Sequence, residues 1–205
     1  MNMKIIVFGA GKVGQMLVKI LLESRHKVTV VDEDRELCDE VAAETNAHVV
    51  CGDAADPDLL DELKMGEADH VFAVTGNEET NFLLAVYAKN ANAKNVISRA
   101  SEAKYSNLME RLGVEPMIPE STLARELSNR VLSPLIFQML DPSNSNIELR
   151  ERDVNGSMAG KKVKKVEDDN KFTIISVYQE GKFIFPHNDF KLKKDMRIVV
   201  VKHKL

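Results

Sequence analysis

The stretch Lys4-Ile-Ile-Val-Phe-Gly-Ala-Gly-Lys-Val-Gly14 decides the fold expected for this chain. Residues 4–8 form a mostly apolar run, typical of a strand buried on both faces of a parallel sheet. Three glycines follow with the spacing Gly-x-Gly-x-x-Gly. The helix predicted after them carries apolar residues at helical intervals, at Val13, Met16, Leu17, Ile20 and Leu21. A strand, a glycine-rich turn and a helix in this order indicate the first unit of a Rossmann-type fold.

Strand-like and helix-like segments alternate over the next hundred or so residues. This alternation predicts a doubly wound α/β fold, a parallel sheet with helices on both faces and right-handed crossovers. The glycine-rich first turn favours the strand order 3-2-1-4-5-6, with a ligand crevice between the first and fourth strands. The further strands are predicted at 27–31, 48–51, 70–74, 95–98 and 116–118.

The glycine loop and the carboxyl ends of the strands form the candidate site for an adenine nucleotide. Gly9 permits the tight turn, Gly11 lets the backbone approach a pyrophosphate, and Gly14 lets helix and strand pack closely. Asp32 follows Gly14 by 18 residues, the usual spacing for an acid that bonds ribose hydroxyls and repels the 2′-phosphate of NADP. The candidate cofactor-binding residues are Gly9, Ala10, Gly11, Lys12, Val13, Gly14, Asp32, Glu33, Asp53, Ala54, Thr75, Gly76 and Arg99.

Several of these candidates are inferred from their position alone. Lys12 is either a cation within reach of a phosphate or an exposed lysine. Residues 53–54 follow the third strand and are expected to line an adenine pocket, whereas residues 75–76 follow the fourth strand and face the pyrophosphate. Arg99 ends the fifth strand at the same edge. A purely structural role is the alternative for each of them.

The character of the sequence changes after the sixth predicted strand. A long helix is predicted from residue 121 to 140, and Pro134 is expected to kink it or split it in two. This helix either packs on its own domain or is exchanged with a second subunit, and we favour exchange. The polar stretch 141–146 is the candidate linker, and Glu180-Gly181 is expected to form a hairpin turn. The expected parts are a Rossmann domain at 1–120, a crossover helix and linker at 121–145, and a small α+β domain at 146–205.

Composition narrows the class of protein. The chain has 205 residues and a net charge of −4, which disfavours nucleic-acid binding. Its apolar runs are far shorter than the ~20 residues of a membrane-spanning helix, and no signal-peptide pattern precedes the first strand, so a cytoplasmic location is expected. Cys38 and Cys51 lack metal-ligand spacing and are expected to be reduced and buried or half-buried. The four lysines within 161–165 are expected to form a solvated helix face.

The sequence offers no catalytic set. A dehydrogenase needs a proton donor or base near the nicotinamide, but His26, His48 and His70 lie at the strand ends away from the ligand. Neither a Tyr-x-x-x-Lys pair nor a P-loop pattern occurs. A nucleotide sensor without chemistry is therefore expected. A small NAD-dependent oxidoreductase is the alternative, and a redox-sensing DNA-binding regulator is a weaker one.

Short motifs connect the chain with a known family. They are Gly-Ala-Gly-Lys-Val-Gly at 9–14, Val-Val-Asp at 30–32, Cys-Gly-Asp-Ala at 51–54, Ala-Asp-His-Val-Phe-Ala-Val-Thr at 68–75, Glu-Glu-Thr-Asn at 78–81 and Ser-Arg at 98–99. With them the chain resembles the TrkA/KtrA family of potassium-transport regulatory subunits, built of RCK (or KTN) domains. The later part resembles the TrkA-C module, at 158–161, 174–178, 185–186, 192–195 and 198–201.

The resemblance implies a cytoplasmic ring, usually of eight such domains, docked at the inner face of the membrane on a potassium channel or transporter. NAD(H) or ATP/ADP bound in the Rossmann domains would change the shape of the ring and gate ion flow. The helix at 121–140 would cross over to a dimer partner, and the C-terminal domain of some members binds a second effector such as a cyclic dinucleotide. KtrA-like members carry an arginine in the glycine loop. This chain has Lys12 and a loop closer to the TrkA pattern, which slightly favours NAD(H).

Overall fold

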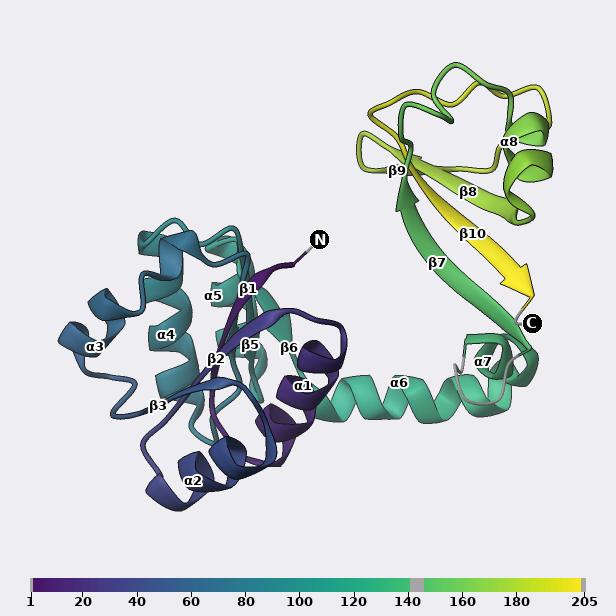
Figure 1. Ribbon diagram of the computed structural model, residues 1–205. Coiled ribbons are helices and arrows are strands. Elements are labelled where there is room, and N and C mark those ends of the chain that lie inside the picture. Colours follow the sequence, from purple (N-terminus) through teal and green to yellow (C-terminus); the bar gives the residue numbers. More distant parts are fainter. Residues whose placement is uncertain (1, 141–145, 204–205) are drawn as a thin grey trace. The chain divides into compact units, whose positions relative to one another are not determined.

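The computed structural model describes residues 2–140 and 146–203. The chain divides into two compact units, residues 1–125 and 126–205 (Figure 1). The predicted linker at 141–146 falls mostly on 141–145, outside the described residues.

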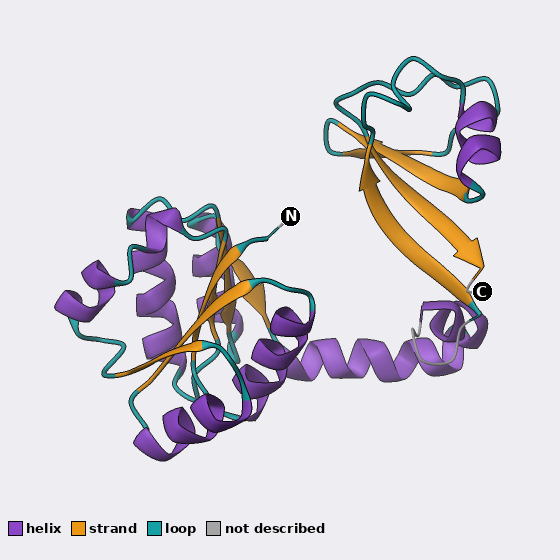
Figure 2. Cartoon of the chain, in the orientation of Figure 1, coloured by secondary structure: helices purple, strands orange, loops and turns teal. Residues whose placement is uncertain are grey.

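The first unit is built on a six-stranded parallel sheet (Figure 2). Its order, β3-β2-β1-β4-β5-β6, confirms the predicted order and the Rossmann-type fold. In the central strand, Val7 lies opposite Val30 on one side and Phe72 on the other. The strands are β1 (Lys4–Phe8), β2 (Lys27–Asp32), β3 (His48–Cys51), β4 (His70–Ala73), β5 (Asn95–Arg99) and β6 (Glu115–Met117).

Helices cover both faces of this sheet because successive side chains of a strand point to opposite faces. In β1, Ile5 and Val7 enter one apolar core, and Ile6 and Phe8 enter the other. Each such fully buried side chain contributes about 1.5–3 kcal/mol to stability. The first core is closed by α1 (Lys12–Glu23) and α2 (Arg35–Glu44), and the second by α3 (Pro57–Glu62), the 3₁₀ turn η1 (Met65–Glu67), α4 (Glu78–Asn90) and α5 (Ala103–Arg111).

Polar caps set where three of these helices begin. The side chain of Asp34 accepts hydrogen bonds from two backbone N–H groups in the first turn of α2. Asp56 caps α3 with Pro57 in its first turn, and Asn77 caps α4. Each cap satisfies backbone donors that have no partner within the helix.

The apolar stripe predicted for α1 faces the core only in part. Leu17 and Leu21 pack against it, whereas the other three residues stay exposed, which corrects the sequence-based expectation for them. Gly14 and Val18 are the buried residues of this helix. Gly14 lies directly against the end of β1 and thereby fixes the rotation of the helix about its axis. One side of the stripe is consequently left outside, with Val13 53%, Met16 65% and Ile20 58% exposed.

The long helix expected at 121–140 is split in two, as Pro134 predicts. The first part, α6, spans Pro119–Leu132, and the second, α7, spans Pro134–Leu140. Proline has no N–H to donate, so a new helix starts at this residue. None of the residues of α6 is buried in the single chain.

The second unit contains a four-stranded antiparallel sheet in the order β7-β10-β8-β9, so this part is α+β as expected. Its core gathers Val166, Val177, Leu192 and Ile198, among others. The predicted hairpin turn joins β8 to β9, and Glu180 and Gly181 both have the positive φ angles, 50° and 79°, that a two-residue hairpin requires. The elements are β7 (Ile147–Asp153), α8 (Val163–Asn170), β8 (Thr173–Gln179), β9 (Lys182–Ile184) and β10 (Arg197–His203).

The lysine run at 161–165 lies at the surface, where Lys161 and Lys162 form ion pairs with Asp169 and Asp189. Acidic partners thus offset this local positive charge. Within the described ranges, no helix is long and apolar enough to cross a membrane.

The two cysteines differ in exposure. Cys38 is buried, as expected, but Cys51 is exposed, which corrects the expectation that it would be at least half-buried. Its position at the end of the edge strand β3 explains the difference, because no further strand covers it.

Candidate functional site

A cavity of about 530 Å³ lies at the carboxyl ends of the parallel strands, at the point where the strand order reverses. Open α/β sheets place their ligands at such a point. Eleven of the thirteen candidate residues line this cavity. The other two are buried behind it, Ala10 in the loop and Gly14 in the first turn of α1. The eleven are Gly9, Gly11, Lys12, Val13, Asp32, Glu33, Asp53, Ala54, Thr75, Gly76 and Arg99.

The three glycines of the loop meet different steric demands. A Cβ atom on Gly14 would lie 1.8 Å from the carbonyl oxygen of Gly9, so only glycine fits there. Gly9 has φ +106°, and a Cβ on it would lie 2.8 Å from the carbonyl oxygen of Val74. Gly11 has nothing within 4 Å of the corresponding position. The protein itself therefore requires Gly9 and Gly14, while Gly11 leaves free space at the crevice.

The amino end of α1 points its backbone donors at this space. Gly11 is the N-cap residue, and none of the described side chains caps the helix or places an acid in its first turn. The first N–H groups of a helix and its dipole together favour an anion. This end of the crevice is thus suited to a phosphate group.

Asp32 holds the glycine loop as well as facing the crevice. Its carboxylate accepts a hydrogen bond of 2.5 Å from the N–H of Ala10 and one of 2.9 Å from the N–H of Asp34. The end of β2 is thereby tied to the loop after β1. Sequence spacing predicted only a ribose contact for Asp32 and not this bracing role. The local bond to Asp34 had a signal, since Asp side chains often bond the backbone two residues on. The bond to Ala10 spans 22 residues and had none.

The opposite wall of the crevice is fixed by a buried asparagine. Asn81, 1% exposed, accepts hydrogen bonds from both the N–H (2.9 Å) and the hydroxyl (2.8 Å) of Thr75. Its amide group donates to the carbonyl of Thr75 at 3.2 Å. A buried amide with its partners satisfied holds one conformation. Asn81 was not among the predicted site residues, although it lies in the Glu-Glu-Thr-Asn motif.

A second link joins the starts of α4 and α5 beside Arg99. The Glu78 carboxylate accepts hydrogen bonds from the backbone N–H groups of Glu102 and Ser101, which lowers the pKa of Glu78 below its usual value. The ends of β4 and β5 are held together in this way. The crevice walls consequently depend on hydrogen bonds that the side chains of Asn81 and Glu78 accept. Sequence spacing did not single out either residue as part of the site.

Charges are separated along the crevice. Asp32, Glu33 and Asp53 stand at the ends of β2 and β3, on one side of the glycine loop. Lys12 begins α1, and Arg99 ends β5 on the other side. Carboxylates accept hydrogen bonds from sugar hydroxyls, and cations attract phosphates. Lining residues that the sequence did not predict are Val31, Asp34, Leu37, Val74, Asn77 and Thr80.

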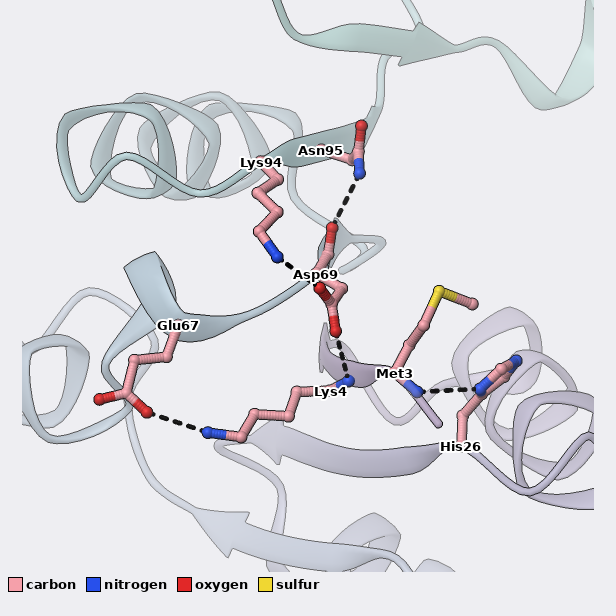
Figure 3. Close-up of polar contacts among 7 residues, drawn as sticks. All are labelled: Met3, Lys4, His26, Glu67, Asp69, Lys94 and Asn95. Carbon is pink, nitrogen blue, oxygen red and sulfur yellow. Dashed lines mark hydrogen bonds and ion pairs between the residues drawn. The ribbon is translucent and has the colours of Figure 1, made fainter. Parts of the chain in front are cut away.

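The amino ends of the strands are occupied by a separate set of contacts (Figure 3). Asp69 accepts hydrogen bonds from the N–H of Lys4 and the ammonium group of Lys94, and His26 accepts one from Met3. A cavity of about 490 Å³ opens at this edge, and none of the predicted site residues lines it. Nowhere in the described part of the chain do three His, Cys, Asp or Glu residues converge to hold a metal ion.

Comparison with known proteins agrees with this geometry. The model of the TrkA-N domain family matches residues 5–120. A Trk system potassium uptake protein TrkA homolog from Methanothermobacter thermautotrophicus is 28% identical over 201 residues, 97% of this chain and 93% of the relative. A homolog with the same name from Archaeoglobus fulgidus is 26% identical over 96% of this chain, which spans only 45% of that longer relative.

Solved structures share the fold. The GsuK channel bound to NAD matches all of this chain with a TM-score of 0.56 at 19% identity, over 38% of its own chain. The human SLO3 gating ring matches 98% of this chain with a TM-score of 0.67 at 10% identity, over 44% of its own chain. GsuK bound to ADP matches 65% of this chain, and 35% of its own, with a TM-score of 0.53 at 20% identity.

Replacing Gly14 by alanine is expected to destabilise the fold, although alanine favours helix, because the new methyl group collides with the carbonyl of Gly9. Overpacking of this kind costs about 1–3 kcal/mol or more. Gly11→Ala is the matched control, with open space at its Cβ and an expected change below about 1 kcal/mol. Urea unfolding of both variants measures the difference. Equal stability of Gly14→Ala and the native chain would contradict the close approach of α1 to β1.

Proposed function

The chain belongs to the TrkA-N domain family, and on that premise we propose that it is a nucleotide-sensing regulatory subunit of a potassium channel or transporter. The observation that carries the proposal is the crevice, in which the glycine loop, Asp32 and Arg99 converge at the switch point of the sheet. The name of the relative that matches almost the whole chain, a potassium uptake protein, supports the transport role.

The ligand is NAD(H) or ATP/ADP. Both contain an adenosine joined to a pyrophosphate, which fits acids at one end of the crevice and cations with a helix start at the other. The GsuK channel, whose fold is similar, is known bound to NAD and to ADP. The carboxylates of Asp32, Glu33 and Asp53 would repel a third phosphate on the ribose, so NADP is disfavoured.

The working form is a homodimer that assembles into a ring of eight RCK domains. Exposed apolar side chains along α6 and α7 support this, since Val131 and Leu135 are 79% and 78% exposed in the single chain. Large apolar surfaces of this kind mark interaction sites. The exposed stripe of α1, with Met16 and Ile20, offers a second apolar surface for the partner. The human SLO3 structure, whose fold is similar, is a gating ring.

The mechanism is a shift between two shapes of the ring. A nucleotide gates ion flow only if it binds the two shapes with different affinity. A tenfold difference corresponds to about 1.4 kcal/mol per site. The ring lies in the cytoplasm and reaches the inner face of the membrane through its partner. In this proposal, residues 1–120 bind the nucleotide, residues 121–145 cross over to the partner, and residues 146–205 form the domain that in some family members binds a second effector.

We propose no catalytic role for this crevice. Neither histidine nor tyrosine is among the described residues that line it, so the usual proton donors of dehydrogenases are missing there. The alternative function, that of a small NAD-dependent oxidoreductase, requires turnover of NADH with a carbonyl substrate. Robust turnover abolished by a single change in the crevice would replace the regulatory proposal.

Gly11→Ala is expected to weaken nucleotide binding without loss of stability, because its methyl group occupies the free space where the pyrophosphate approaches the loop. We expect affinity at least tenfold lower, about 1.4 kcal/mol. Calorimetric titration with NAD⁺, NADH, ATP and ADP measures it. Asp39→Ala, on the exposed side of α2, is the control with unchanged affinity. Native affinity in Gly11→Ala would place the phosphates elsewhere.

Leu127→Glu is expected to disrupt the dimer, because it puts a charge into the exposed apolar stripe of α6. Sedimentation velocity should show the native chain as a dimer or larger ring and the variant as a smaller species. Asn129→Glu, which lies off the stripe on the same helix, should assemble normally. A native chain that stays monomeric at all concentrations would disprove the assembly.

Potassium flux through the membrane protein that co-purifies with the chain is expected to depend on the nucleotide. Vesicles containing this complex should differ in flux between at least two of the four nucleotides, because those nucleotides stabilise different ring shapes. With Gly11→Ala, the same response should require at least tenfold more nucleotide. A gating role would be ruled out if no nucleotide changed the flux while the native chain still bound the nucleotides.

A further inference from the structure

Two thiols meet beside the crevice although they are separated in the sequence. Cys51 ends β3, and its Cα atom pairs with that of Asp32 in the neighbouring strand. Side chains two residues apart in a strand share a face, so Cys51 lies on the same face as Val49, which packs in the core closed by α2. Cys38 is a buried residue of α2. The fold thus brings both sulfur atoms to one side of the sheet.

The hydrogen bonds of the two thiols show how close they are. The Sγ atom of Cys38 donates to the carbonyl of Asp32 at 3.4 Å, and that of Cys51 donates to the carbonyl of Glu33 at 3.9 Å. These carbonyls belong to consecutive residues. Burial and, next in size, the neighbouring Cys51 thiol together raise the pKa of the Cys38 thiol to about 12. The two thiols therefore lie against adjacent carbonyl groups of the same backbone segment.

We propose that Cys38 and Cys51 form a reversible disulfide that makes the nucleotide crevice sensitive to oxidants. Cys38 is 3% exposed, whereas Cys51 is open to solvent, so one thiol can meet an oxidant and the other can resolve it. A metal site is the other common use of paired thiols. It requires further ligands, and none converge here among the residues described.

The oxidant is a hydroperoxide, and the reaction proceeds in two steps. The sulfur of Cys51 attacks the outer peroxide oxygen, the O–O bond breaks, and an alcohol or water leaves, so that Cys51 becomes a sulfenic acid. The sulfur of Cys38 then attacks the sulfur of Cys51, the S–O bond breaks, and the thiol proton leaves with the hydroxyl as water. In total, two thiols lose two electrons and two protons, and one peroxide is reduced. A small dithiol reverses the reaction by exchange.

Closure of the disulfide acts on the walls of the crevice. The sulfurs must approach to about 2 Å, which draws α2 toward β3 and removes the S–H donors from the carbonyls of Asp32 and Glu33. Leu37 precedes Cys38 and lines the crevice, as does Asp53, two residues after Cys51. We expect the oxidised form to bind nucleotide more weakly, an effect that rests on the proposed function. By linkage, bound nucleotide should then disfavour the disulfide.

The test uses the full chain, reduced and then exposed to hydrogen peroxide. Intact mass after alkylation should show the loss of two hydrogen atoms and no alkylated cysteine, and dithiothreitol should restore both thiols. In Cys38→Ser, Cys51 should retain an oxygen that dimedone traps. In Cys51→Ser, the buried Cys38 should stay a thiol. Native protein that keeps both thiols, or over-oxidises Cys51 while Cys38 stays reduced, would overturn the proposal.

Calorimetric titration with ADP separates this proposal from the proposed function. Affinity should fall at least threefold on oxidation of the native chain and stay unchanged on peroxide treatment of Cys51→Ser, with circular dichroism checking that each form is folded. Equal affinity of reduced and oxidised native chain would overturn the link to the crevice. If the reduced chain binds none of the four nucleotides, the sensing function fails, whereas the mass measurement still decides whether the disulfide forms.

Discussion

The close approach of Gly14 to the carbonyl of Gly9 is the constraint on which the first unit depends. It seats the start of α1 against β1 and aims its free N–H groups at the crevice. Neighbouring strands are fastened beside this loop, β4 through the hydrogen bond from the N–H of Val74 to the carbonyl of Phe8 and β2 through the bond from Ala10 to Asp32. One short loop therefore connects three strand ends, and the shape of the crevice follows from it.

The same constraint decides what the chain exposes. With Gly14 turned inward, α1 cannot bury the whole of its apolar stripe, and Met16 and Ile20 remain at the surface. Helices α6 and α7 likewise carry large exposed apolar side chains. Each such side chain that becomes fully buried adds about 1.5–3 kcal/mol, so covering these surfaces would be strongly favourable. Self-association is thus a physical expectation of the fold as well as a property suggested by its family.

The sequence predicts those features that local patterns encode. The buried run before the glycine loop leads to the Rossmann fold and its strand order, Pro134 marks a helix break, and Glu180-Gly181 marks a hairpin. The sequence does not predict contacts that depend on tertiary packing. Asn81 reaches Thr75 only once α4 is in place, and the rotation of α1 is set by a steric contact rather than by hydrophobic periodicity. Cys38 and Cys51 meet only because β3 pairs with β2 beneath α2.

Helix α1 gives the proposed sensor a short path from ligand to assembly. Its first residues, Lys12 and Val13, line the crevice, and its stripe at Met16 and Ile20 begins within one turn of them. A packed helix moves as a rigid body, so a displacement of its amino end by a phosphate is felt along the whole stripe. Coupling requires an element with two arrangements that both sites bias. If the partner packs on this stripe, α1 is such an element. Helix α1 alone would then connect the nucleotide with the ring.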